Sequence, residues 1–268
     1  MTSPMIPSPT GYTRLYVTLG HPVAQVKSPE VLNVIFASAN VDAVMLPVEV
    51  HPDDLTATME GLKRVRNLDG MLITVPHKFA VVPHLDHKSA MVELAGAVNA
   101  LRREPDGRWT GDNFDGRGFV AGLNKQGHTV EGRTIVLVGA GGAGAAIAPA
   151  LLEAGAAHLQ LVDLNEQKAS SLASRLLQVW PGTVDIAQRP TLDGADIVVN
   201  ATPLGLQNDD PLPFDPSKVS GNTVVADIIM KPAETRLLRE AAEAGLVTHA
   251  GIHMLDGQIA FYRQFFGF

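Results

Sequence analysis

The sequence has no cysteine among its 268 residues, and this absence excludes several kinds of chemistry. Without thiols the chain can form no disulfide, no thiolate zinc site and no cysteine nucleophile. A chain without cysteine suits a reducing compartment, and we expect this one to be cytoplasmic. Aromatic residues are also scarce at 5%, and charged residues reach only 18%, whereas 46% hydrophobic residues predict a well-filled globular core.

Long apolar runs and an excess of positive charge are also lacking. No apolar run approaches the roughly 20 residues that a membrane-spanning helix needs, and residues 1–10 lack the basic start and apolar core of a signal peptide. We expect these first residues to form a frayed tail. The net charge of −7 leaves no broad basic surface for nucleic acid or anionic lipid, so an anionic small molecule would need a local cationic site. His21, His77 and His253 do not have the spacing of metal ligands, so we expect no metal.

Strand and helix patterns alternate along the whole chain, which predicts an α/β fold with helices packed on parallel sheets. In the first half, Ser28 is predicted to be the N-cap of a helix that has Pro29 in its first turn. Pro76 is predicted to stop a buried strand, and Asp106-Gly107 is typical of a hairpin turn. The predicted elements are strands at 14–20, 43–50 and 70–75, helices at 28–40 and from 53 onward, a hairpin of 97–103 with 108–111, and a helix at 116–125.

The second half begins with a strand at 134–139 that runs directly into the glycine-rich segment Gly139-Ala-Gly-Gly-Ala-Gly144 and a helix through Ala154. Glycines in this pattern allow a tight turn, while the free N–H groups and the helix dipole favour a pyrophosphate. A second strand at 158–163 ends in Asp163, 24 positions after Gly139, where an acid is expected after about 20. A glycine-rich connector in another α/β domain is the plainer alternative, but this context favours dinucleotide binding. Further strands at 196–201, 223–229 and 246–250, a helix at 234–244 and a last helix at 255–266 complete a doubly wound sheet.

Several segments in order resemble the shikimate dehydrogenase family over nearly the whole chain. The matching segments are Gly20-His-Pro-Val with Lys27-Ser-Pro29, Thr74-Val-Pro-His-Lys78, Gly96-Ala-Val-Asn99, Gly111-Asp-Asn-Phe-Asp-Gly116, the glycine-rich turn, Asn200-Ala-Thr-Pro-Leu-Gly205, 227–232, and 251–255 with Gln258. The resemblance implies an N-terminal α/β substrate-binding domain at 11–115, with the C-terminal segment 253–268 packed back on it. It also implies a C-terminal doubly wound Rossmann dinucleotide-binding domain at 116–252.

The same resemblance implies which residues form the site. Lys78 and Asp115 would be the catalytic pair, and the family reversibly reduces a cyclic ketone acid. The residues expected around the substrate are Ser28, Thr74, Asn99 and Gln258. Those expected at the cofactor are Gly139, Gly141, Gly142, Ala143, Gly144, Asp163, Thr202, Ile228 and Gly251.

Hydride exchange between a nicotinamide and a secondary alcohol needs a group that takes or returns the hydroxyl proton. Lys78 or Asp115 could do this, and the sequence leaves open which one accepts the proton. Taken singly, each has a plainer reading, as a solvated lysine after a strand and as a helix-capping aspartate. Thr74 and Asn99 could simply satisfy buried backbone groups.

Five positions depart from the family pattern and make poor turnover of shikimate itself a reasonable expectation. Val26 replaces one of two serines that hold the substrate carboxylate in the family, and Phe114 and Met230 replace a usual threonine and tyrosine. Ala250 and His253 alter the usual Asp-Gly-x-Gly run. Lys27 could supply charge to a carboxylate instead, although a surface lysine is the plainer reading.

The segment after the second strand of the Rossmann domain also departs from the family pattern. Asp163-Leu164-Asn165 stands where NADP-using members carry a cofactor clamp that includes an arginine. An acid there can accept hydrogen bonds from the ribose hydroxyls of NAD and opposes a 2′-phosphate, so we expect NAD to be preferred, with NADP possible. The expected partner is a small carboxylate substrate, and the expected state is a monomer or homodimer. A nicotinamide-binding regulatory protein with little turnover, a dehydrogenase of another small cyclic acid and a methylenetetrahydrofolate dehydrogenase are the alternatives.

Overall fold

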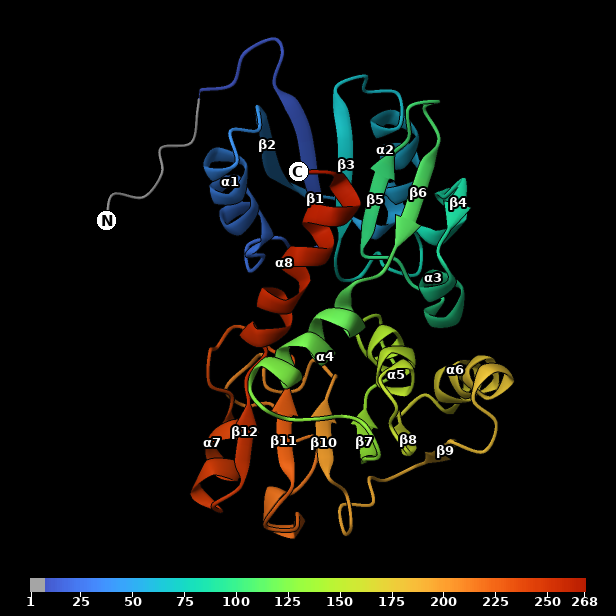
Figure 1. Cartoon of the computed structure of the whole chain (residues 1–268), viewed down its shortest axis with the longest axis vertical. Helices are drawn as coiled ribbons and strands as arrows, with labels where there is room; N and C mark the ends of the chain where they lie inside the picture. The colour runs from blue at the N-terminus through green and yellow to red at the C-terminus, as the bar shows by residue number, and fades with distance from the viewer. Residues whose placement is uncertain (1–7) are drawn as a thin grey trace. The chain divides into compact units, whose positions relative to one another are not determined.

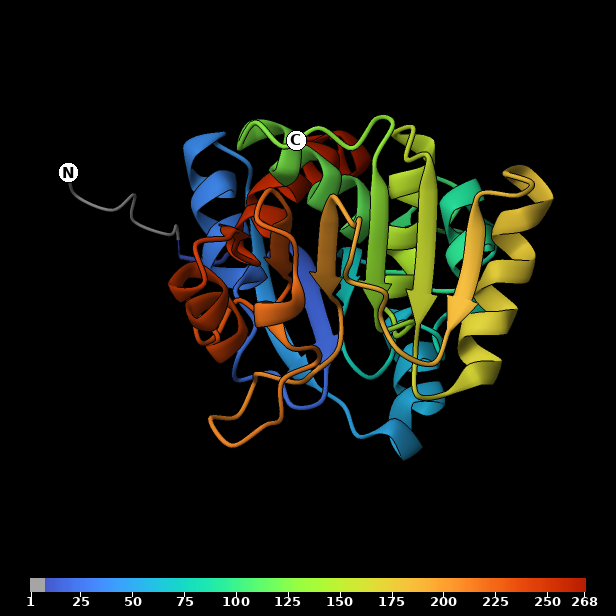
Figure 2. The same ribbon diagram turned by 90° about the horizontal axis from the view of Figure 1, so that it is seen from below.

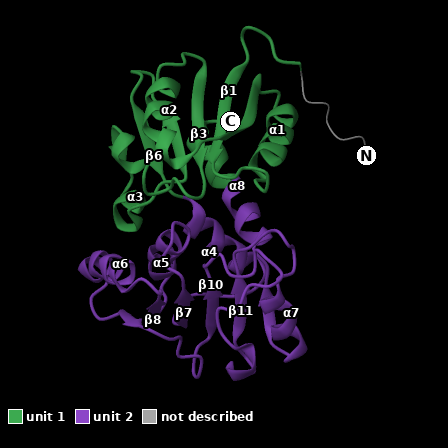
Figure 3. Cartoon of the chain, turned by 180° about the vertical axis from the view of Figure 1, so that it is seen from behind, with its two compact units in different colours: residues 1–113, 260–268 green, residues 114–259 purple. Residues whose placement is uncertain are grey.

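The computed structural model describes residues 8–268 and divides the chain into two compact units (Figures 1 and 3). The first unit contains the described chain up to Asn113 together with Ala260–Phe268, and the second contains Phe114–Ile259. Both units are α/β, as predicted, and the last helix, α8 (Ile252–Phe266), has residues in each. Most of the tail predicted for residues 1–10 lies outside the described residues.

The first unit is built on a six-stranded mixed sheet in the order β2-β1-β3-β5-β6-β4 (Figure 1). The first three strands in this order are parallel, and β5 runs antiparallel to both β3 and β6. The predicted hairpin at Asp106-Gly107 joins β5 to β6, with Gly107 at φ +87°. The strands are β1 (Arg14–Gly20), β2 (Ala43–Glu49), β3 (Leu68–Ile73), β4 (His87–Lys88), β5 (Ala100–Arg103) and β6 (Trp109–Asp112).

Helices cover the two faces of this sheet because side chains alternate along each strand. Val17 and Leu19 point into a core with Leu55 and Met59 of α2. On the other face, the ring of Tyr16 packs against Phe36 of α1 and Phe266 of α8. The helices are α1 (Ser28–Ser38), α2 (Leu55–Leu62) and α3 (Ala90–Ala95), with short 3-10 turns at Pro52–Asp54 and Val82–His84.

The prediction that Ser28 caps α1 is wrong. The N-cap is Lys27, whose side chain makes no capping hydrogen bond, and Ser28 is the first helical residue. The Ser28 hydroxyl instead lies 2.9 Å from the hydroxyl of Thr18 on β1. A tertiary partner, ten residues away in the chain, therefore replaces the local capping bond.

The second unit contains a six-stranded, fully parallel sheet in the order β12-β11-β10-β7-β8-β9. The sheet is doubly wound, as predicted: the chain adds β8 and β9 on one side of β7 and then β10, β11 and β12 on the other, so the order of the strands reverses between β7 and β10. The strands are β7 (Thr134–Val138), β8 (His158–Val162), β9 (Val184–Ala187), β10 (Ile197–Asn200), β11 (Val224–Asp227) and β12 (Val247–His249). Ligands bind at such a reversal, beyond the carboxyl ends of the strands.

Side chains that alternate along β7 again point to opposite faces of the sheet, and helices cover both faces. Ile135 and Leu137 lie in a core with residues of α4, α5 and α6, whereas Val136 and Val138 lie in a core with residues of α7. The edge strand β9, which lies beside α6 (yellow in Figure 2), was not predicted from the sequence. The helices are α4 (Asp115–Lys125), α5 (Gly144–Glu153), α6 (Glu166–Val179) and α7 (Arg236–Glu243), with a 3-10 turn at Pro216–Lys218.

Candidate active site

The predicted substrate residues of the first unit gather where β1 and β3 end. Thr74 follows β3 directly, and its backbone N–H donates to the Leu19 carbonyl at 2.8 Å. A side chain at Gly20 would clash with the Thr74 methyl group at 2.5 Å, so this glycine permits the close approach of the two strand ends. Ser28 is joined to the same end of β1 through Thr18.

Lys78 lies in the turn after β3 and is only 8% exposed. Its carbonyl accepts a hydrogen bond from the N–H of Val98 at 2.9 Å, which holds the turn beside the segment that carries Asn99. The Asn99 carbonyl in turn accepts from the N–H of Ile73, and its amide donates to the hydroxyl of Tyr262 at 3.2 Å. A buried ammonium group and a buried amide are thus held by loops at one end of the sheet.

Asp115 and Gln258 belong to the second unit and contact each other directly. The Gln258 amide donates to an Asp115 carboxylate oxygen at 2.9 Å, and both side chains are almost fully buried. A Cβ at Gly118 would lie 2.4 Å from Gln258, so this glycine lets α8 pack closely on α4. Asp115 is the first residue of α4 and Phe114 is its N-cap, so Asp115 does not occupy the capping position that the plainer reading gave it.

The glycine-rich turn between β7 and α5 fits a bound pyrophosphate. Gly139 has φ +106°, and a Cβ at Gly144 would lie 1.9 Å from the Gly139 carbonyl oxygen, so both positions require glycine. A Cβ at Gly141 would meet nothing within 4 Å, which leaves that position open to a ligand. Gly142 and Ala143 lead into α5, where the helix dipole favours an anion. Within the first turn, the N–H groups of Ala145 and Ala146 already donate to the carbonyls of Gly141 and Ala143, at 2.8 and 3.0 Å.

Asp163 follows β8 and braces this turn. One carboxylate oxygen accepts from the Ala140 N–H at 2.7 Å and the other from the Asn165 N–H at 2.8 Å. Each oxygen keeps a second lone pair, so a ribose hydroxyl could still donate to the carboxylate. Leu164, which stands in place of the arginine clamp, is fully exposed.

The remaining predicted cofactor residues follow the other parallel strands. A Cβ at Gly139 would lie 2.9 Å from the Thr202 nitrogen, and one at Gly251 would lie 2.4 Å from the Ile228 carbonyl oxygen. Thr202 after β10 is therefore placed beside the turn, and Ile228 after β11 is placed beside Gly251.

A buried polar network that the sequence did not single out holds these loops. Asn200 accepts from the Thr202 hydroxyl at 2.7 Å and donates to Asp227 at 3.2 Å, and Asp227 accepts from the Thr235 hydroxyl at 2.8 Å. Burial raises the pKa of Asp227, against the hydrogen bonds from Ile229, Thr235 and Asn200 that lower it. Asn200 and Asp227 each begin one of the segments that carry the family resemblance, which was the available signal.

The residues that depart from the family pattern differ in exposure. Phe114 is buried, whereas Val26 and Met230 are half-buried. Lys27 is exposed and pairs with Glu30 of the same helix at 3.3 Å, in agreement with its reading as a surface lysine.

His249 on β12 is a buried histidine that makes no hydrogen bond within the described residues. It is 1% exposed, neither ring nitrogen has a partner, and its ring contacts those of Phe119, His128 and His253. Burial, with smaller effects from His253 and His128, lowers the pKa of His249 to about 4. The folded protein therefore holds this ring in its neutral form.

This pKa predicts a loss of stability in acid. Between about pH 6.5 and pH 4 the unfolded chain binds a proton at His249 that the folded chain does not, so folding weakens by about 3 kcal/mol as pH falls through that range. We expect His249→Phe to flatten the pH dependence of the free energy of unfolding by about this amount, measured by urea denaturation. The exposed His87→Phe is the control, and parallel curves for His249→Phe and the parent protein would contradict the prediction.

Within residues 8–268, no helix is long and apolar enough to cross a membrane. The same residues contain no group of three or more histidine or acidic side chains arranged to hold a metal ion.

Comparisons with known proteins agree with this geometry. The family model described as the shikimate dehydrogenase substrate binding domain matches residues 18–101, and the one described as shikimate / quinate 5-dehydrogenase matches residues 122–205. A curated relative from Rubrobacter xylanophilus, named shikimate dehydrogenase (NADP(+)), is 36% identical over 259 residues, which cover 93% of this chain and 89% of the relative.

Solved structures with other substrates in their names are similar too. Quinate dehydrogenase from Corynebacterium glutamicum in complex with NAD has a TM-score of 0.85 and 29% identity, with 96% of this chain and 94% of that chain covered. The ligand-free 5-ketofructose reductase of a Gluconobacter strain has a TM-score of 0.83 and 31% identity, with 95% and 92% covered. Because family models match both halves and a named relative is similar over nearly its whole length, this chain belongs to the shikimate dehydrogenase family.

Proposed function

We propose that this protein is a nicotinamide-dependent dehydrogenase that interconverts a hydroxyl and a ketone on a small cyclic carboxylic acid such as shikimate or quinate. The observation that carries the proposal is the turn between β7 and α5. There, Gly139 and Gly144 are required by backbone contacts while the position of Gly141 stays open. A turn of this kind at the reversal of a doubly wound sheet suits a dinucleotide.

The proposed cofactor residues are those of the glycine-rich turn together with Asp163, Thr202, Ile228 and Gly251. A bound nicotinamide supplies the group that donates or accepts hydride. The backbone N–H groups of the glycine-rich turn that leads into α5 would bind the pyrophosphate, and Asp163 would accept from the adenosine ribose. These roles place cofactor binding in the second unit.

The proposed substrate residues are those that the family resemblance implies. Ser28, Thr74 and Asn99 of the first unit and Gln258 of the second would hydrogen-bond the substrate, while Lys78 and Asp115 would hold and transfer the hydroxyl proton. Gln258 also donates to Asp115, so the amide would orient the carboxylate against the substrate. Which of Lys78 and Asp115 accepts the proton stays open.

The absorbance of reduced nicotinamide tests the proposal. Purified protein is mixed with NAD or NADP and with shikimate or quinate, and we expect oxidation of at least one of these acids. No turnover with either cofactor, combined with tight dinucleotide binding, would favour the regulatory alternative. Light scattering on the same sample tests the expected monomer or homodimer.

A different hydroxylated ring is the second candidate substrate. Val26 removes one hydroxyl from the family's carboxylate site, and an unsatisfied substrate group costs about 1–3 kcal/mol, or roughly tenfold or more in affinity. The similarity to a 5-ketofructose reductase supports adding 5-ketofructose to the substrate panel. If the protein reduces 5-ketofructose and oxidises neither shikimate nor quinate, the result would favour this second candidate.

We propose NAD as the preferred cofactor, although the name of the Rubrobacter relative points to NADP. The support is the carboxylate of Asp163 beside the turn and the exposed Leu164 in place of the clamp arginine. Unit charges about 4 Å apart at an effective dielectric near 20 interact by roughly 4 kcal/mol. Even after strong screening this exceeds the 1.4 kcal/mol that changes a preference about tenfold.

We expect the catalytic efficiency with NAD to exceed that with NADP by at least about tenfold. Leu164→Arg combined with Asp163→Asn is expected to narrow or reverse this ratio, because it adds a cation for the 2′-phosphate and removes an anion. Asparagine keeps an oxygen that can accept from the Ala140 N–H, so the hydrogen bond that holds the turn should persist. Leu164→Ala is the control, and steady-state kinetics in which the parent protein favours NADP would refute this role of Asp163 without affecting the proposed dehydrogenase activity.

A further inference from the structure

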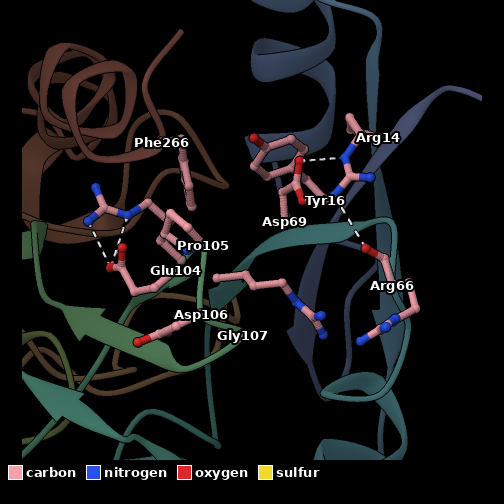
Figure 4. A pocket seen from close by; sticks show the side chains of 11 residues that line it. Arg14, Tyr16, Arg66, Asp69, Glu104, Pro105, Asp106, Gly107 and Phe266 are labelled. Carbon is pink, nitrogen blue, oxygen red and sulfur yellow. Dashed lines mark hydrogen bonds and ion pairs between the residues drawn. The ribbon is translucent and has the colours of Figure 1, made fainter.

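The first unit contains a pocket of about 490 Å³ that none of the proposed substrate or cofactor residues lines (Figure 4). Asp69, near the start of β3, borders it, whereas Thr74 and Lys78 follow the end of the same strand. At about 3.3 Å per residue, the length of β3 separates the pocket from Thr74 by about 16 Å. The pocket is therefore distinct from the substrate site proposed above, and its volume is in the range of small-molecule sites.

Four arginines and three carboxylates line this pocket, and their pairing leaves two arginines without an acid. Arg14 is paired with Asp69, and Arg102 donates to Glu104 at 2.8 Å. These contacts raise the pKa of Arg14 and lower that of Glu104, so both pairs stay ionised. The third carboxylate, on Asp106, is paired with Arg108, which is not part of the lining.

Arg66 and Arg103 are the two remaining cations. Arg66 is exposed and its side chain forms no ion pair with any described residue; Figure 4 shows it beside Arg14, with Glu104 and Phe266 on the opposite side. Arg103 is half-buried, and its guanidinium lies over the ring of Trp109. One terminal nitrogen donates to the Lys63 carbonyl at 2.5 Å, while its Nε is buried without a partner. In a protein with a net charge of −7, two neighbouring guanidinium groups without an acid partner make the potential locally positive.

Tyr16 also lines the pocket. Burial, with a smaller effect from Asp69, raises the pKa of Tyr16 to about 12, so its phenol keeps its proton and can donate a hydrogen bond. The ring of Phe266 packs against it. The pocket thus combines guanidinium groups with an aromatic surface.

We infer that this pocket binds a small organic oxyanion, whose phosphate or carboxylate groups contact Arg66 and Arg103. A guanidinium group presents parallel N–H donors that match two oxygens of either group. The two oxyanion types share this chemistry and are distinguished by the probes below. This site is independent of the proposed catalytic function.

Isothermal titration of the full chain with sodium pyrophosphate and with citrate tests the inference. At low ionic strength we expect saturable binding of at least one anion, with Kd of about 1 mM or tighter. Binding of both indicates recognition of oxyanion charge in general, and binding of one identifies the phosphate or the carboxylate class. Saturable binding of neither would overturn the inference.

Variants at two neighbouring arginines assign the binding to this pocket. Arg66→Ala is expected to weaken binding at least about tenfold and Arg66→Glu to abolish it, whereas Arg64→Ala should change it less than about twofold. Arg64 is exposed, carries the same charge and does not line the pocket. Pyrophosphate bound only at the glycine-rich turn would be unaffected by Arg66→Ala. Equal effects of the Arg64 and Arg66 substitutions, or no effect of either, would overturn the inference.

Discussion

Replacing Lys78 with alanine is expected to lower the turnover number at least about a hundredfold while leaving dinucleotide binding within about twofold. Proton transfer by a positioned side chain contributes about 10²–10⁴-fold to rate, and the proposed role of Lys78 depends on its ammonium group. All the residues proposed to hold the cofactor lie in the second unit, whereas Lys78 lies in the first. Steady-state kinetics give the turnover number, and fluorescence titration with NADH gives the cofactor affinity.

Lys88→Ala is the matched control for this experiment. Lys88 is exposed on the short edge strand β4 of the same unit, and its removal changes the net charge equally. We expect normal turnover in this variant. Near-normal turnover in Lys78→Ala would show that Lys78 takes no part in the chemistry and is a buried structural lysine.

Asp115→Asn is expected to lower kcat/KM for the hydroxy acid about a hundredfold or more, with much less effect on cofactor affinity. Asparagine has nearly the same size and keeps an oxygen that can accept the hydrogen bond from Gln258, so the contact between α4 and α8 should persist. What is lost is the negative charge and the capacity to hold or accept a proton at the substrate hydroxyl.

Two further variants separate charge from packing at this position. Asp256→Asn, at an exposed site on α8, is the control and should leave kinetics unchanged. Gln258→Leu removes the amide while keeping its bulk, and we expect it to impair substrate use less than Asp115→Asn. Unchanged kinetics in Asp115→Asn would show that the carboxylate only supports the start of α4.

The sequence predicted the elements that follow from local rules. The glycine spacing of 139–144, with a strand before it and a helix after it, placed the turn between β7 and α5 correctly, because steric limits on φ and close backbone contacts act within a few residues. The hairpin at Asp106-Gly107 followed from the same rules. Elements with weaker local patterns, such as the two-residue β4 and the edge strand β9, were missed because pairing with a neighbouring strand defines them.

The sequence predicted where side chains lie along the helices and strands better than it predicted which side chains form hydrogen bonds with each other. The sequence placed Ser28 at the start of a helix but could not show that its hydroxyl pairs with Thr18 rather than with the helix backbone. Asn200 and Asp227 lay in recognised segments, yet their shared hydrogen bond depends on the parallel register of β10 and β11.

By itself, therefore, the sequence determined the α/β class, the order of most elements, the glycine-rich turn and the family, since each depends on residue types at short spacing. Only the tertiary structure decided that Gln258 donates to Asp115, 143 residues away, and that Arg66 and Arg103 line a pocket while neither has an acid partner. The physical reason is that these arrangements come from helix packing and strand register. Both bring together segments that are remote in the chain, and no local pattern records which polar groups then meet.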